Sequence, residues 1–271
     1  MNYRHAFHAG NFADLVKHAA LLQVLARRPA GPLSIIDTHA GRGLYDLGAP
    51  EAQRSGEAAA GIVQLMRAQD LPAPFAPLRA AVSRLNRDGE IRLYPGSPLL
   101  IAEALRPGDS YLACELRPEE HSALAQVLKG CDGVKTACAD GFARAADLPR
   151  DGEALVLIDP PFERADDYAR IVGTLAAIAR RNPRAQVMVW LPIKDLETFD
   201  GFVRDAEDAG AGPLLVAEAR MRPLADPLKM NGCALVFARP AAGLAPVLDA
   251  ICGWTVQRLG DRGQARVWSA G

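Results

Sequence analysis

Four consecutive residues could carry out chemistry together: Asp159, Pro160, Pro161 and Phe162. The apolar residues 155–158 before them are typical of a buried parallel strand, and the two prolines prevent that strand from continuing. We therefore expect a carboxylate and an aromatic ring at the carboxyl end of a strand, where open α/β sheets bind their ligands.

This grouping suits methyl transfer to an exocyclic amine such as adenine N6, whose lone pair is delocalised into the ring. Asp159 can accept one N–H of the amine and the Pro160 carbonyl the other, which localises the lone pair towards an electrophile. Phe162 provides a flat face on which a base can stack. A plain strand-to-loop exit is the alternative, because Asp-Pro pairs often begin turns. The aromatic ring and the preceding strand favour the catalytic interpretation.

Three other predicted strands also end close to acidic residues. They are 33–37, which ends at Asp37 before a loop with His39, Gly41 and Gly43; 110–115, which ends at Glu115; and 134–138, which is followed by Asp140 and Gly141. The glycines let backbone approach a ligand closely. Because the carboxyl ends of parallel strands meet at one edge of the sheet, we expect one binding site there.

The acidic residues indicate an adenosine ligand. We expect Glu115 to accept both hydroxyls of a ribose and Asp140 to accept an adenine amino group. The chain has no Lys-Ser/Thr phosphate loop, so an adenosine that carries a sulfonium amino acid fits better than a dinucleotide or a triphosphate. Ser97 is predicted to cap helix 98–105 and to hold the carboxylate of that amino acid at the electropositive helix end.

Two further segments surround this predicted sheet. Asn11 is expected to cap a helix that runs to about Arg28. Residues 46–95, with helical patterns at 56–68 and 75–86, separate the first strand from the second and predict a helical insertion. Four arginines in it form either an RNA-facing patch or a solvated helix face: Arg79, Arg84, Arg87 and Arg92. The other strands and helices alternate, which predicts a mostly parallel sheet.

Composition limits the possible partners. The 271 residues carry a net charge of −1, so any nucleic-acid contact must come from a local patch rather than from the whole surface. No apolar run is long enough to span a membrane, and the N-terminus lacks the features of a signal peptide. The five cysteines contain no Cys-x-x-Cys pair and predict reduced thiols. We expect a cytoplasmic monomer without a membrane partner.

With these residues identified, the chain resembles bacterial 23S ribosomal RNA adenine-N6 methyltransferases of the RlmJ type. The resemblance is carried by Tyr3-Arg4-His5 through His8-Ala9-Gly10-Asn11, Ala13-Asp14, Lys17-His18, Asp37-Thr38-His39-Ala40-Gly41, Tyr94-Pro95-Gly96-Ser97-Pro98, Asp140-Gly141 and Asp159-Pro160-Pro161. It implies a Rossmann-like class I methyltransferase fold, with a mostly parallel seven-stranded sheet flanked by helices. It also implies one methyltransferase domain, 1–271, in which 1–28 cover the active site and 46–95 form an inserted helical subdomain.

The resemblance further implies S-adenosylmethionine as cofactor, S-adenosylhomocysteine as product, no metal, and a flipped-out adenine of 23S ribosomal RNA as substrate. Cofactor contacts carry over to His18, His39, Gly41, Ser97, Glu115, Asp140, Gly141 and Asp159. Catalytic roles fall to Asp159, Pro160, Pro161, Phe162 and Lys17. Tyr3 and His5, with Lys17, match a mobile tail that closes over the cofactor and the base, and Phe162 contacts the RNA. Phe162 stands where a tyrosine is usual, which removes a hydroxyl and keeps the stacking face.

Other functions remain open from the residues alone. Asp-Pro-Pro-aromatic motifs also serve DNA adenine-N6 and cytosine-N4 methyltransferases, and only the resemblance favours ribosomal RNA. A metal-dependent hydrolase could use the clustered His5, His8, His18 and His39. A binding module that has lost its chemistry would not need to keep Asp159. For Lys17, a solvent-facing helix position is the alternative to a role in the site.

Overall fold

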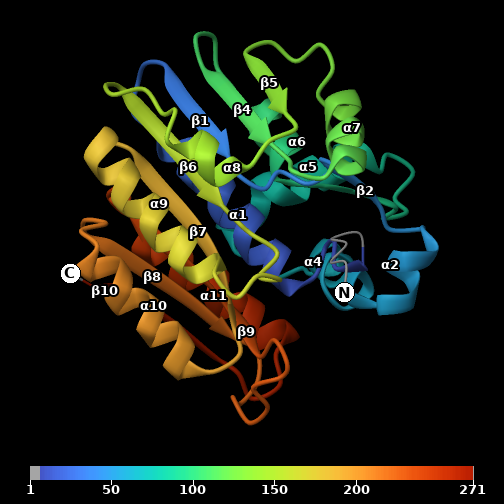
Figure 1. The fold of residues 1–271 in the computed structure, drawn as a ribbon. Coiled ribbons are helices and arrows are strands. Elements are labelled where there is room, and N and C mark those ends of the chain that lie inside the picture. The colour runs from blue at the N-terminus through green and yellow to red at the C-terminus, as the bar shows by residue number, and fades with distance from the viewer. Residues whose placement is uncertain (1–6, 271) are drawn as a thin grey trace.

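An eight-stranded sheet organises the protein in the computed structural model, which describes residues 7–270 (Figure 1). Its strands are β1 (Leu33–Asp37), β4 (Ser110–Cys114), β5 (Val134–Ala137), β6 (Glu153–Ile158), β7 (Gln186–Ile193), β8 (Leu214–Arg220), β9 (Gly232–Ala238) and β10 (Gln264–Ala270). Their order across the sheet is β10-β8-β9-β7-β6-β1-β4-β5. Five neighbouring strands are parallel: β7, β6, β1, β4 and β5. Strand β9 is antiparallel to β7 and β8, and β10 is antiparallel to β8. The prediction of a mostly parallel sheet is confirmed. The predicted sheet has seven strands, and the edge strand β10 is the eighth.

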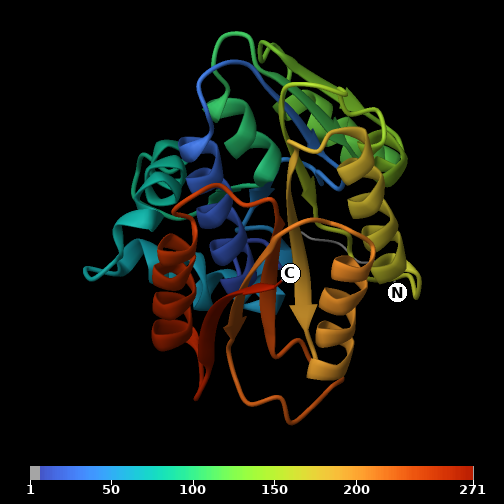
Figure 2. The same ribbon diagram turned by 90° about the vertical axis from the view of Figure 1, so that its left-hand side faces the viewer.

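Helices cover both faces of this sheet, as the two views of the ribbon show (Figures 1 and 2). The first layer contains α1 (Phe12–Arg27), α6 (Ser97–Ala104), α7 (Pro118–Val127) and α11 (Ala245–Leu259), and the second contains α8 (Gly141–Ala145), α9 (Asp167–Arg181) and α10 (Leu196–Asp208). Each layer encloses its own buried apolar cluster against one face of the sheet. None of the helices within residues 7–270 has the length and apolar character needed to cross a bilayer.

Helix α1 begins where the sequence predicts. The Asn11 side chain accepts hydrogen bonds from the Ala13 and Asp14 amides, which satisfies two donors at the helix start. Most of the helix is buried, because it packs between α6, α5 and α11. Burial of this helix brings even charged residues, such as Lys17, into the interior.

The segment between β1 and β4 folds into short elements that pack against α1, α6 and α11 and share their buried apolar cluster. It contains β2 (Leu44–Asp46), α2 (Pro50–Ser55), α3 (Glu57–Ala60), α4 (Ile62–Arg67), the 3-10 helix η2 (Ala73–Phe75), α5 (Ala76–Leu85) and β3 (Leu93–Pro95). Strands β2 and β3 pair with each other in an antiparallel ribbon outside the main sheet. The predicted helical stretches are present, although Gly61 divides the first of them.

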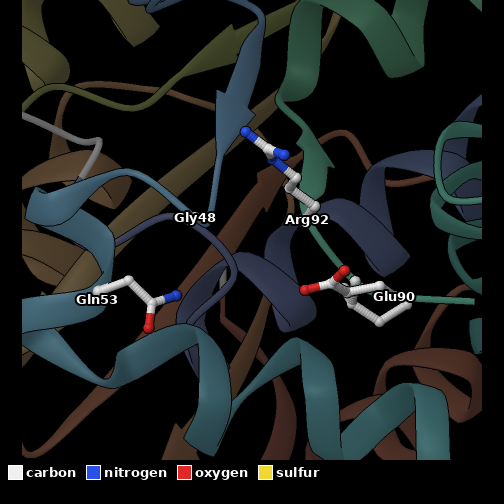
Figure 3. A pocket seen from close by; sticks show the side chains of 5 residues that line it. Gly48, Gln53, Glu90 and Arg92 are labelled. Atoms are coloured by element: carbon white, nitrogen blue, oxygen red, sulfur yellow. The ribbon is translucent and has the colours of Figure 1, made fainter.

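Three of the four arginines of the predicted patch contact other residues of the protein, whereas Arg87 is exposed. The Arg79 guanidinium donates to the carbonyls of Met66 and Ala68, so this residue has a structural role. Arg84 pairs with Glu103. Arg92 lines a hollow of about 320 Å³ (Figure 3), and its guanidinium lies 3.4 Å from Asp46. An RNA-facing patch built from these arginines would have to break several of these contacts.

Candidate active site

A cavity of about 790 Å³ opens at the carboxyl ends of the parallel strands. This volume lies within the roughly 300–1,000 Å³ that is typical of small-molecule sites. The site residues predicted from the sequence that line it are Lys17, His18, His39, Gly41, Ser97, Glu115, Asp140, Gly141, Asp159, Pro160, Pro161 and Phe162. The structure therefore brings together residues from six separate parts of the chain. Tyr3 and His5 lie outside the residues that the structure describes, so their predicted roles stay predictions.

Asp159 follows the last residue of β6 and turns its carboxylate to Lys17. The Lys17 ammonium donates to Asp159 Oδ2 at 2.6 Å and lies 3.0 Å from Asp14 Oδ1. The Lys17 side chain is only 7% exposed, so the solvent-facing alternative for this residue is wrong. Helix α1 thus closes one side of the cavity with a cation that faces the motif at residues 159–162.

Electrostatics keep Lys17 charged. Burial on its own would lower the pKa of this ammonium, but Asp14 and Asp159 outweigh burial and raise the pKa well above its usual range. A lysine that acts as a base needs a lowered pKa, and this one has the opposite. Lys17 is therefore a permanent cation that orients Asp159.

Asp14 was not among the site residues predicted from the sequence, although it completes this arrangement. Its second oxygen accepts the Gly10 amide at 2.9 Å, so one carboxylate joins the chain entering α1 to Lys17. Asp14 is 2% exposed. Its spacing of three residues from Lys17 on a helix was the available signal, because such residues share a face.

Glu115 follows β4 and is fixed by backbone. One of its oxygens accepts the Gly41 amide at 3.0 Å and the other accepts the Arg117 amide at 2.8 Å. Gly41 has a φ of +65°, and a Cβ there would lie 2.5 Å from the Tyr45 hydroxyl oxygen. Glycine is thus required where this loop approaches the cavity, and the Glu115 carboxylate is oriented before any ligand binds.

Asp140 and Gly141 bring the loop after β5 against the loop after β1. Asp140 caps α8 by accepting the Phe142 amide at 3.0 Å, and it pairs with Arg170. A Cβ on Gly141 would lie 1.9 Å from the Thr38 carbonyl oxygen, so only glycine permits this contact between loops.

The histidines of the site are uncharged or engaged. His39 packs edge-on against Phe142, with 4.8 Å between the ring centroids. Burial lowers the pKa of His39 to about 4, so the imidazole is neutral at physiological pH. His18 is buried and its Nδ1 lies 2.7 Å from the Tyr94 hydroxyl oxygen. The neutral His39 imidazole suits contacts with the polar groups of a ligand.

The role of Ser97 as a helix cap is a prediction that the structure contradicts. Gly96 is the N-cap residue of α6, and Ser97 is the first residue of the helix. The Ser97 hydroxyl donates instead to Asp37 Oδ2 at 2.8 Å, where it stabilises a fully buried carboxyl. Burial raises the pKa of Asp37 to about 7. Ser97 still lines the cavity, so a ligand contact by this residue stays a prediction.

Phe162 has an unusual backbone conformation for a bulky residue, with a φ of +51°. Its ring packs near Tyr168 and Trp190, at centroid distances of 5.0 and 5.8 Å. Backbone strain of this kind costs about 1–3 kcal/mol and concentrates at functional sites. Trp190, a cavity residue on β7, was not predicted, because nothing in the sequence around it indicates a position beside Phe162.

The histidine cluster that suggested a metal hydrolase is dispersed in the fold. His8 pairs with Glu57 at 2.9 Å, His18 contacts Tyr94, and His39 Nδ1 lies 2.7 Å from the Thr38 hydroxyl oxygen. Within residues 7–270, no group of three or more metal-binding side chains is arranged to hold an ion. The geometry therefore gives no support to a site that depends on these imidazoles as metal ligands.

Comparison with known proteins decides the family. Residues 30–270 match the family described as ribosomal RNA large subunit methyltransferase D, RlmJ. The chain belongs to the RlmJ family. The resemblance noted in the sequence is confirmed, and the protein is an enzyme of the methyltransferase class.

Curated relatives match nearly the whole chain. Ribosomal RNA large subunit methyltransferase J of Escherichia coli is 32% identical over 263 residues, covering 96% of this chain and 94% of that protein. The Haemophilus influenzae protein of the same name is 32% identical and covers 97% of this chain and 95% of its own. A crystal structure of a Legionella pneumophila protein superposes with a TM-score of 0.88 at 25% identity, covering 97% of this chain and 98% of the other. The Rossmann-like methyltransferase fold predicted from the sequence is confirmed.

Proposed function

We propose that this RlmJ-family protein transfers a methyl group from S-adenosylmethionine to N6 of a flipped-out adenine in 23S ribosomal RNA. The observation that carries the proposal is the Asp159 carboxylate, which leaves β6 into the cavity and is held there by Lys17. The names of the two curated relatives support ribosomal RNA as the substrate class. The catalytic roles proposed from the sequence fall on Asp159, Pro160, Pro161, Phe162 and Lys17.

The residues present fit S-adenosylmethionine. Glu115 is oriented by two backbone amides and can accept ribose hydroxyls, and Asp140 can accept the adenine amino group. Gly41 and Gly141 keep Cβ atoms out of crowded positions at the cavity wall. The remaining contacts proposed for the cofactor are His18, His39, Ser97 and Asp159. When bound, this cofactor supplies an electrophilic methyl group on a sulfonium, and no metal is needed.

Orientation of the amine is the task of the motif at residues 159–162. Lys17 engages Asp159 Oδ2, and no other side-chain hydrogen bond to this carboxylate occurs within residues 7–270, so Oδ1 is available for one N6–H. The Pro160 carbonyl accepts the second N6–H, which localises the nitrogen lone pair towards the methyl donor. Transfer is a direct displacement without a covalent enzyme intermediate.

Base extrusion must precede this step, at a cost of a few kcal/mol. Phe162 receives the extruded base, and its contacts with Tyr168 and Trp190 hold the ring in place. Tyr3 and His5 are proposed to close over the base from the N-terminal side. We further propose that residues 46–95 act as an inserted subdomain of a single methyltransferase domain, and that the enzyme is a cytoplasmic monomer.

Incubation with methyl-labelled S-adenosylmethionine and unmodified 23S ribosomal RNA tests the proposal. The label is expected in N6-methyladenosine after nucleoside analysis. Asp159→Ala should abolish turnover, whereas cofactor binding, measured by calorimetry, should weaken far less, because the other proposed cofactor contacts remain. Label in another nucleoside, transfer only to DNA, or near-normal turnover by Asp159→Ala would each contradict the proposal.

A further inference from the structure

Residues 221–231 form the loop between β8 and β9, which lies at the lower end of Figure 1 and contributes residues to the cavity wall. Arg222, Lys229 and Met230 of this loop line the cavity. Leu228, between them, is 90% exposed. An isolated exposed leucine is common on protein surfaces, so its significance depends on its surroundings.

The loop is held in place by its own hydrogen bonds. The Asp226 carboxylate accepts the Leu228 amide at 3.0 Å, and the Asp226 carbonyl accepts the Lys229 amide at 3.2 Å. The buried Asn231 side chain donates to the Asp226 carbonyl at 2.8 Å and to the Lys194 carbonyl at 3.0 Å. Leu228 is thus presented by an ordered turn, which lowers the entropy cost of using it in binding.

Charge at the cavity is concentrated beside the same loop. Among the lysines and arginines that line the cavity, five are paired with carboxylates: Lys17, Arg117, Arg164, Arg170 and Lys229. Lys194 and Arg222 also line the cavity, and neither makes an ion pair within the described part of the chain. Both residues adjoin Asn231. The Asn231 carbonyl accepts the Arg222 amide at 3.3 Å, and the Asn231 side chain donates to the Lys194 carbonyl. The two residues whose cations make no ion pair are therefore joined through Asn231 by their main chains at the base of the loop.

We infer that the β8–β9 loop docks the RNA strand next to the extruded adenine, with Lys194 and Arg222 on phosphates and Leu228 as a wedge in the base stack. The inference rests on the proposed function, because the wedge is needed only if a base leaves its stack. Apolar side chains such as leucine insert between bases in this way in other nucleic-acid complexes. The net charge of −1 requires such a local cationic patch.

The phosphate contacts are tested by binding without the cofactor. The Kd for unmodified 23S ribosomal RNA is measured by filter binding over a range of salt concentrations. For Arg222→Gln and Lys194→Gln, the slope of log Kd against log salt should each fall by about 0.7–0.9, the value for one lost phosphate contact. Lys129→Gln is the matched control, because Lys129 is exposed just before β5, at the opposite end of the sheet. Unchanged slopes for both cavity variants would overturn the phosphate role.

The wedge is tested by kinetics with the same RNA. Leu228→Ala should lower kcat/KM about tenfold, because less energy is available to unstack the target, whereas Leu228→Met keeps a wedge and should stay within about twofold. A synthetic RNA with an abasic residue beside the methylated adenine needs less unstacking. On that RNA, Leu228→Ala and the wild type should converge. An equal defect on both RNAs would overturn the wedge.

The controls separate the two proposals. If the wild type methylates no adenine in RNA, the proposed function fails and the inference fails with it. If the wild type methylates RNA and the variants of Lys194, Arg222 and Leu228 behave like it, only the inference fails. A defect seen with intact large-subunit particles but not with free 23S ribosomal RNA would identify a protein partner for the loop and overturn the RNA assignment.

Discussion

At the scale of single residues, Lys17 lies between two carboxylates that come from different parts of the chain. Asp14 is one turn away on the same helix, whereas Asp159 is 142 positions away in sequence. Asp14 also accepts the Gly10 amide, so the start of α1, Lys17 and the Asp159 carboxylate form one connected unit. We therefore predict that Asp14 is a positioning residue, which acts on the reaction through Lys17.

Asp14→Asn tests this connection. The amide keeps the shape and one acceptor but removes a charge, so Lys17 loses one of its two anionic partners. We expect kcat to fall about tenfold with a smaller change in KM, and the free energy of unfolding to fall by about 2 kcal/mol. Steady-state kinetics and urea unfolding measure the two effects.

Asp70→Asn is the matched control, because Asp70 is exposed and should leave both quantities unchanged. A purely structural role for Asp14 would lower stability and leave kcat intact, and that result would contradict the positioning role.

At the scale of elements, the site depends on loops that touch one another at the ends of β1 and β5. Gly141 is the point of closest approach, since a side chain there would collide with the Thr38 carbonyl. Gly141→Ala should push the loops apart and lower the free energy of unfolding by about 2–3 kcal/mol. It should also weaken cofactor binding, measured by calorimetry, because His39 and Asp140 lie on the displaced loops.

Gly173→Ala provides the control for this substitution. Gly173 is exposed within α9, and a Cβ there would meet no atom within 4 Å. Alanine has the higher helix propensity, so this variant should gain about 0.5–1 kcal/mol. If Gly141→Ala were as stable as the wild type, close packing of the two loops would not be a constraint on the site.

Strand ends were predictable because their physics is local. The apolar run at 155–158 and the prolines after it fix where β6 stops, and the same reasoning places Asp37 and Glu115 at strand ends. Nine of the twelve predicted residues that line the cavity follow such strand ends, whereas Lys17 and His18 lie on α1 and Ser97 begins α6.

Contacts between distant segments were not predictable from such patterns. The ion pair of Lys17 with Asp159 depends on how α1 crosses the sheet, and the bond from Ser97 to Asp37 depends on the packing of α6. The position of Trp190 beside Phe162 likewise follows from the pairing of β6 with β7.

For the whole molecule, two neighbouring groups with shifted pKa values should oppose each other in the pH dependence of stability. His39 has a pKa lowered to about 4, against about 6.5 for an unfolded histidine. Between these values the unfolded chain binds more protons, so this group makes stability rise with pH. Asp37 has a pKa raised to about 7, against about 3.9 unfolded. Between these two pKa values the folded protein binds more protons than the unfolded chain, so Asp37 makes stability fall as pH rises from about 4 to 7.

Single variants should separate the two contributions. Asp37→Asn removes the contribution that makes stability fall as pH rises. The free energy of unfolding of this variant, relative to the wild type, should therefore increase from pH 4 to pH 7. His39→Gln removes the contribution that makes stability rise with pH. The free energy of unfolding of this variant, relative to the wild type, should therefore decrease from pH 4 to pH 6.5. Because the His39 ring is partly exposed, His39→Gln should change the free energy of unfolding less than Asp37→Asn does, on the order of 1–2 kcal/mol. Urea unfolding at several pH values measures both, and parallel pH curves for the wild type and the variants would show that neither group is perturbed by the fold.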